Sequence, residues 1–146
     1  MTPGTNASNA GRQPMLRGAL VGLAALIALA CLIASTLHFG AVFTLGATRI
    51  AEPPVLVAAI VEGTIGIVMI VVAAAVFARR PWAWNAAVAG YLFGIGGFAV
   101  GILALVRDPG LRTGFNVAMH AGVLPLLVLG LALTLTAAGR EALSVR

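Results

Sequence analysis

The residues of this sequence that could carry chemistry are a few polar side chains inside long apolar runs. Glu62, His38 and His120 each lie in a different run. Ionisable groups at bilayer depth cost on the order of 2.5–3.5 kcal/mol, so they face a protein interior or a cavity and mark functional sites. A carboxyl group and two imidazoles can together exchange protons with a ligand or bind a metal ion. These three residues are therefore the starting point for a candidate site.

Counting along the runs places these groups at one level. Glu62 is the eighth residue of its run and His120 the seventh, so each lies about 10 Å from the start of a helix. If the first run forms a helix that ends near Leu45, His38 lies about 10 Å below that end. We therefore predict that His38, Glu62 and His120 converge near one face of the membrane.

Two further polar residues are predicted to join this cluster. Asn116 lies four residues before His120, which places both on one face of a helix. Tyr91 is the tenth residue of its run, near the midplane, where its hydroxyl group could reach the cluster from below. The predicted ligand-binding or proton-coupling residues are therefore His38, Glu62, Tyr91, Asn116 and His120. No catalytic residue is assigned, and whether the chain is an enzyme stays open.

Several functions are compatible with this cluster. A lipid-soluble quinone could bind there, because a His or Glu accepts a hydrogen bond from a quinol hydroxyl group and passes its proton outward. Alternatively, the two histidines could ligate haem iron, or His38, Glu62 and His120 could form a three-ligand metal site. The cluster could also line a solute or proton path in a dimer. In a purely structural interpretation, protonated Glu62 is hydrogen-bonded to His38 or His120 and only ties helices together.

The composition requires a membrane around these residues. Hydrophobic residues make up 61% of the 146 residues and charged residues 9%, and the mean hydropathy is +1.08. Soluble proteins have roughly 45–50% apolar and about 25% charged residues, so a soluble globule is excluded. The nine basic residues are arginines placed singly or in pairs, which does not predict nucleic-acid binding. One cysteine, Cys31, excludes a disulfide framework within the chain.

Four apolar runs separated by Pro and Gly predict an all-α fold, an integral membrane four-helix bundle over residues 16–138. Each run exceeds the roughly 20 residues that cross a bilayer, and the expected spans are 18–45, 55–78, 82–106 and 114–137. Residues 1–15 are predicted as a disordered tail and 139–146 as a cytoplasmic tail. The first run would measure about 45 Å as a helix, so residues 40–50 either extend it or fold back as an outer cap.

The arginine distribution predicts that both termini are cytoplasmic, in the inner (plasma) membrane. Six arginines fall on the side of the termini, against three on the other: Arg12, Arg17, Arg79, Arg80, Arg140 and Arg146, against Arg49, Arg107 and Arg112. In the third run, the pairs Gly90/Gly94 and Gly97/Gly101 have helix-packing spacing. They favour tight packing inside the bundle; the alternatives are a homodimer face and membership of a larger membrane complex.

Residues 58–97, AAIVEGTIGIVMIVVAAAVFARRPWAWNAAVAGYLFGIGG, resemble the DoxX-like family of small four-helix membrane proteins. That family has a Glu followed by glycines early in its second helix, matched by Glu62, Gly63 and Gly66, then a basic turn, matched by Arg79 and Arg80. The resemblance implies quinone-linked oxidation of sulfur compounds or a membrane oxidoreductase assembly. The resulting prediction is a redox-associated or quinone-interacting subunit with quinone as the favoured cofactor. The alternatives are a non-catalytic structural or assembly subunit and a metal- or haem-binding protein.

Overall fold

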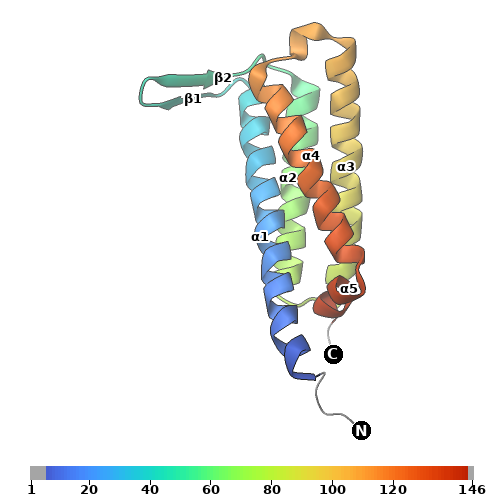
Figure 1. The fold of residues 1–146 in the computed structure, drawn as a ribbon. Coiled ribbons are helices and arrows are strands. Elements are labelled where there is room, and N and C mark those ends of the chain that lie inside the picture. The colour runs from blue at the N-terminus through green and yellow to red at the C-terminus, as the bar shows by residue number, and fades with distance from the viewer. Residues whose placement is uncertain (1–5, 145–146) are drawn as a thin grey trace.

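The computed structural model describes residues 6–144, most of which are helical. Four long helices lie alongside one another (Figure 1): α1 (Asn6–His38), α2 (Leu56–Phe77), α3 (Ala83–Arg107) and α4 (Gly114–Leu135). A β-hairpin of β1 (Val42–Leu45) and β2 (Thr48–Ala51) joins α1 to α2. The 3₁₀ turn η1 (Pro109–Leu111) joins α3 to α4, and the short helix α5 (Ala137–Leu143) follows α4.

Four segments are long and apolar enough to cross a membrane: Gln13–His38, Leu56–Phe77, Ala83–Arg107 and Gly114–Leu135. Their outward faces carry large apolar side chains, such as Leu29, Ile67 and Val100, each more than half exposed. Such a surface is unfavourable in water but suits lipid tails, which are as apolar as leucine. The predicted helical membrane character is therefore confirmed at this level, as a multi-pass membrane protein, whereas the two-stranded hairpin is not part of the predicted all-α fold.

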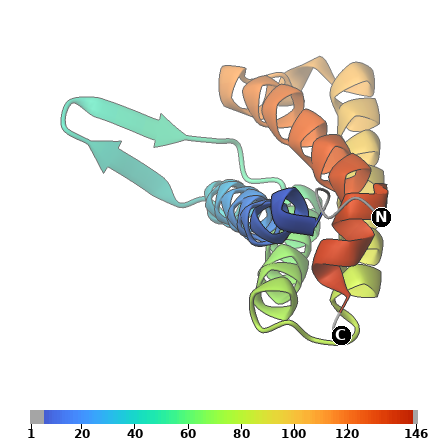
Figure 2. The same ribbon diagram turned by 60° about the horizontal axis from the view of Figure 1, so that its bottom comes forward.

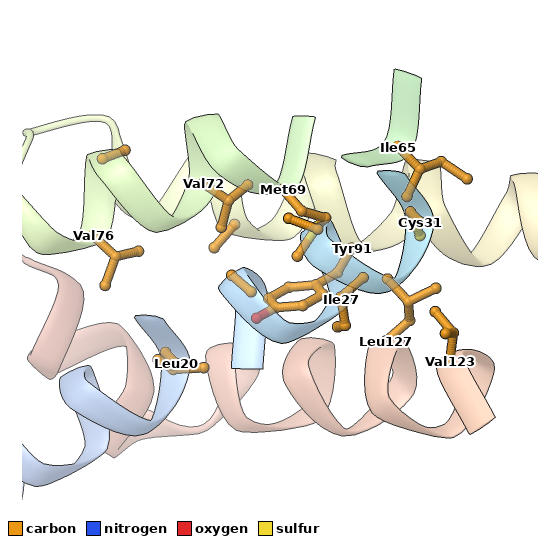
Figure 3. Close-up of a cluster of buried hydrophobic side chains, with 14 of the residues drawn as sticks. Leu20, Ile27, Cys31, Ile65, Met69, Val72, Val76, Tyr91, Val123 and Leu127 are labelled. Carbon is orange, nitrogen blue, oxygen red and sulfur yellow. The ribbon is translucent and has the colours of Figure 1, made fainter. Parts of the chain in front are cut away.

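Side chains from all four long helices form the apolar core (Figure 3). Ile27 of α1, Met69 of α2, Tyr91 of α3 and Leu127 of α4 are almost completely buried. Cys31 is buried in the same cluster and packs as a small apolar residue. The core therefore fills the middle of the helices and leaves the polar residues near their ends.

The glycines of α3 face neighbouring helices. A Cβ atom on Gly90 would lie 2.6 Å from Val72 Cγ2 of α2, and one on Gly94 would lie 2.6 Å from Leu127 Cδ2 of α4. Gly97 faces Ile65 of α2 in the same way, whereas nothing lies within 4 Å of a Cβ on Gly96. The glycine pairs thus serve close packing within the chain, which supports that interpretation over the homodimer face.

Residues 6–15 are helical, so the prediction that residues 1–15 form a disordered tail is wrong for the described part of that segment. Helix α1 begins at Asn6, and residues 6–15 belong to it. Nucleation is the costly step of helix formation, so a helix fixed by packing further along extends at little cost. Helix α5 occupies most of the other predicted tail, because Ala142 and Leu143 are buried. Residues 1–5 and 145–146 lie outside the described residues.

The chain after His38 folds back as a hairpin, so the predicted extension of the first helix to Leu45 is wrong. Gly40 (φ 92°) ends α1, with the Ala41 amide donating to the Thr36 carbonyl oxygen. Gly46 (φ 59°) opens the two-residue turn between the strands. The cross-strand pairs are Val42 with Ala51, Phe43 with Ile50, Thr44 with Arg49 and Leu45 with Thr48.

The hairpin extends sideways from one end of the helices (Figures 1 and 2). Residues 40–50 therefore fold back, as one of the two predicted alternatives has it, but the hairpin does not cover the bundle as a cap. The residues of β1 and β2 that are described are exposed.

We predict that Gly90→Ala lowers the stability of the protein by about 1–3 kcal/mol, because the added methyl group overpacks the contact with Val72. Gly96→Ala is the matched control on the same helix, where the methyl group meets open space. It should leave stability unchanged or raise it slightly through helix propensity. Thermal unfolding followed by circular dichroism in detergent micelles measures both, and destabilisation of only the Gly96 variant would contradict internal packing.

Candidate functional site

A pocket lies between α2, α3 and α4, on the side of the molecule that carries the hairpin. We call it the Glu62 pocket; its volume is about 140 Å³, and its only polar lining side chains are Glu62, Asn116 and His120. An apolar cavity of roughly 150 Å³ admits a benzene ring, so this pocket has room for one six-membered ring. Val57 and Val100 line it and are more than two-thirds exposed, so it opens toward lipid.

Glu62 is held in the wall of this pocket with 5% of its surface exposed. Its Oε2 atom lies 3.8 Å from His38 Nε2 of α1 and has no hydrogen-bond partner among the described residues. Helix α1 comes close enough for this contact because α2 has glycines here. A Cβ atom on Gly63 would lie 2.8 Å from Ser35 Oγ, and one on Gly66 would lie 2.8 Å from Leu32 Cγ.

His38 is the last residue of α1, so the predicted depth of about 10 Å below the helix end is wrong. It still meets Glu62 because side chains lean toward the N-terminus of their helix. In two helices that run in opposite directions, His38 therefore leans into the membrane and Glu62 leans toward the hairpin. The predicted convergence of these two residues is present, whereas His38 does not line the pocket.

The hydrogen bonding of His38 determines where its proton lies. His38 Nδ1 is 3.3 Å from the carbonyl oxygen of Pro53, which can only accept. Nδ1 therefore carries the hydrogen, and the neutral ring presents the lone pair of Nε2 to the Glu62 carboxyl group. The 3.8 Å between these two facing atoms is too long for a direct hydrogen bond, and His38 lies on the side of Glu62 away from the pocket.

His120 lies on the opposite wall of the pocket, on α4. Its Nδ1 donates to the carbonyl oxygen of Asn116 at 2.8 Å, which leaves Nε2 as an acceptor. The ring centroid lies 5.1 Å from that of Phe98, and the ring lies against Gly101, where any Cβ atom would overlap Nε2. Glycine at position 101 is therefore required for this placement of the imidazole.

Asn116 belongs to a chain of hydrogen bonds that connects the base of the hairpin to α4. Its side-chain Nδ2 donates to the carbonyl oxygen of Leu111, and its backbone amide donates to Thr113 Oγ1 at 3.0 Å. Thr113 Oγ1 in turn donates to Glu52 Oε2. Neither Glu52 nor Thr113 is among the residues predicted for the site. Thr113 directly precedes the expected start of the fourth helix, and threonine is a preferred N-cap residue. This N-cap signal could have identified Thr113 from the sequence.

Tyr91 does not join the cluster, so its predicted place near Glu62 is wrong. Its ring lies among core side chains and against Gly130 of α4, where the missing Cβ leaves room for it (Figure 3). The nearest pocket-lining residue of α3 is Gly97, six residues or about 9 Å further along the helix. The Tyr91 hydroxyl group is buried without a hydrogen-bond partner in the described part of the chain.

A three-ligand metal site at His38, Glu62 and His120 is not formed. No group of three His, Cys, Asp or Glu residues within the described chain could hold a metal ion. The reason is geometric, because His38 contacts Glu62 from outside the pocket while His120 Nε2 faces α3 at Gly101.

We predict that Thr113→Val destabilises the protein by about 1–2 kcal/mol, because it removes the N-cap of α4 and the partner of Glu52. Thr64→Val is the matched control, since the exposed Thr64 hydroxyl group bonds only the Ile60 carbonyl of its own helix. Chemical or thermal unfolding in detergent compares the two. Equal stability of the two variants would show that the hydrogen bonds of Thr113 between the hairpin and α4 do not stabilise the protein.

No protein-family model, curated protein or solved structure matches the chain. The resemblance of residues 58–97 to the DoxX-like family therefore stays a prediction.

Proposed function

We propose that the chain is a quinone-binding, redox-associated subunit of the inner (plasma) membrane that holds a quinone headgroup in the Glu62 pocket. The observation that carries the proposal is the composition of this pocket: an apolar wall, open to lipid, with one carboxyl group, one imidazole and one amide. Sites for small ligands generally have this form, with few polar groups that fix the orientation of a mostly apolar ligand.

The polar groups of the pocket suit both redox states of a quinone. Quinone carbonyl oxygens accept hydrogen bonds, which protonated Glu62 can donate. Quinol hydroxyl groups donate hydrogen bonds, which His120 Nε2 or an ionised Glu62 can accept. The exposed Val57 and Val100 at the mouth leave a way for an isoprenoid tail to enter from the lipid.

Glu62 and His38 offer a path for the proton. A proton taken from a quinol hydroxyl group by Glu62 passes to His38 Nε2, behind Glu62 at the end of α1, when the two side chains close the 3.8 Å between them or a water molecule bridges it. In this proposal the chain binds the ring and exchanges protons, and a redox centre of a partner subunit exchanges the electrons.

The proposed orientation is a four-helix membrane bundle with both termini in the cytoplasm and the pocket toward the outer face. Arg17 of α1, Arg140 of α5 and the turn at Arg79 lie at the end opposite the hairpin. The Arg140 guanidinium group lies 4.5 Å from the ring centre of Trp84, an arrangement suited to a membrane interface. The excess of arginines at this end supports a cytoplasmic location.

A structural or assembly role is the second candidate, and the His38–Glu62 contact favours it. This buried contact joins α1 to α2 with no need for a ligand, and a polar contact between membrane helices can stabilise packing alone. The two candidates differ in whether the pocket binds a ring.

We predict saturable binding of a short-chain quinone analogue to the purified protein, weakened about tenfold by Glu62→Leu, which removes the hydrogen bond that the carboxyl group offers the quinone. Gly101→Ala should weaken binding similarly, because its methyl group displaces His120. Isothermal titration calorimetry in detergent measures both variants.

Gly96→Ala is the control for this experiment, since it adds the same methyl group to the same helix away from the pocket. Its affinity should equal that of the unmodified protein. Absence of saturable binding would contradict the quinone proposal and favour the structural or assembly role. A Soret absorbance band in the purified protein would instead support haem binding.

A further inference from the structure

The hairpin is the part of the described chain that packs least against the rest. Strands β1 and β2 make extensive contacts only with each other. An isolated two-stranded hairpin is marginally stable in water and needs a surface against which to pack. We therefore expect another surface to cover the hairpin.

Polar contacts fix the base of the hairpin to the helices. The Val55 amide donates to the His38 carbonyl oxygen at 3.0 Å, and His38 Nδ1 donates to the Pro53 carbonyl oxygen. Glu52 Oε2 accepts from Thr113 at the start of α4. The hairpin therefore leaves the helices at a defined height.

That height corresponds to the edge of the hydrocarbon layer. Arg17 and His38 are 21 positions apart on α1, which is about 32 Å of helix. The hydrocarbon core of a bilayer is about 30 Å thick. With Arg17 at one boundary, His38 and the hairpin lie at the other, among the lipid headgroups.

The direction of the hairpin follows the membrane plane. Its strands extend sideways from the helices (Figure 1), and Figure 2 shows its broad side more fully. One face of the two-stranded sheet is therefore directed along the helices, toward the lipid that surrounds them.

The strand register separates two unlike faces. Phe43 and Ile50 are cross-strand partners and lie on one face, with 42% and 38% of their surfaces exposed. Thr44 and Arg49 are partners on the other face, which also carries the exposed pair Val42 and Ala51 nearer the base of the hairpin. An aromatic ring with an aliphatic partner on one face and a cation near the tip are what a phospholipid interface accommodates.

Exposed apolar residues continue from the helices into the hairpin. Leu56 and Val57 at the start of α2 are 63% and 72% exposed, and Phe39 directly after α1 is 60% exposed. The lipid that covers these residues reaches the base of the hairpin at the same height.

We propose that the hairpin lies flat in the headgroup layer, with Phe43 and Ile50 against the lipid and Arg49 near phosphate groups. The lipid surface thus replaces the sheet or helix that would cover such a hairpin in a soluble protein. Because its base is tied to His38 and Glu52, this anchor also sets the depth of the His38–Glu62 pair. The inference does not depend on quinone binding.

The test is the depth of spin labels on the two faces of the hairpin. Phe43→Cys and Thr44→Cys are prepared in a Cys31→Ala background, labelled, and reconstituted at one chain per phospholipid nanodisc. We expect the label at position 43 to be several-fold more accessible to oxygen than to a water-soluble nickel chelate, and the reverse at position 44. Ile50→Cys, opposite Phe43, repeats the measurement if the Phe43 variant does not fold.

Two results would overturn the proposal. The first is equal access of the nickel chelate to positions 43 and 44, which would place the hairpin in water. The second is protection of position 43 only in crowded liposomes, with magnetic coupling between labels, which would identify a second copy of the chain as the covering surface.

Discussion

The close approach of α1 to α2 is the constraint on which the polar site depends. Because lipid tails are as apolar as the helix surfaces, the hydrophobic effect does not bring membrane helices together. Small residues that let two backbones approach closely therefore determine which helix faces pack against each other. Gly63 and Gly66 provide this contact, and Ser35 Oγ then donates to the Ala59 carbonyl oxygen at 2.7 Å. Side chains larger than glycine at these two positions would separate the helices and remove Glu62 from His38.

Glu62 has two neighbours of different kinds, and this explains why one geometry supports two functional interpretations. On one side lies His38, whose lone pair faces the carboxyl group; on the other side lies the pocket. A carboxyl group that served only as a tie between helices would need no cavity beside it. The pocket keeps its shape because Gly97 and Gly101 of α3 let Ile65 and His120, which line it, lie directly against the α3 backbone.

The sequence predicts the four long helices and the depth of Glu62 along its helix well, because hydropathy and segment length determine which segments can cross a membrane. It predicts the rotation and the ends of helices less well. Tyr91 was assigned to the cluster by depth, but the side chain follows the gap left by Gly130 on another helix, which no local pattern reveals. The end of α1 depended on the left-handed conformation of Gly40, whereas hydropathy continues to Leu45 without a break. Long-range bonds such as Glu52 to Thr113 join residues 61 positions apart and have no local signature.

The distribution of polar contacts along the helices makes any proton exchange at Glu62 one-sided. Toward the hairpin, Glu62 meets His38, which bonds Pro53 at the base of the strands. Toward the opposite end, the next buried residues of α2 are Ile65, Gly66 and Met69. Within the described core, the Tyr91 hydroxyl group at that depth has no hydrogen-bond partner. A proton on Glu62 therefore has polar neighbours on the hairpin side and an apolar barrier on the other, as release to a single face of the membrane requires.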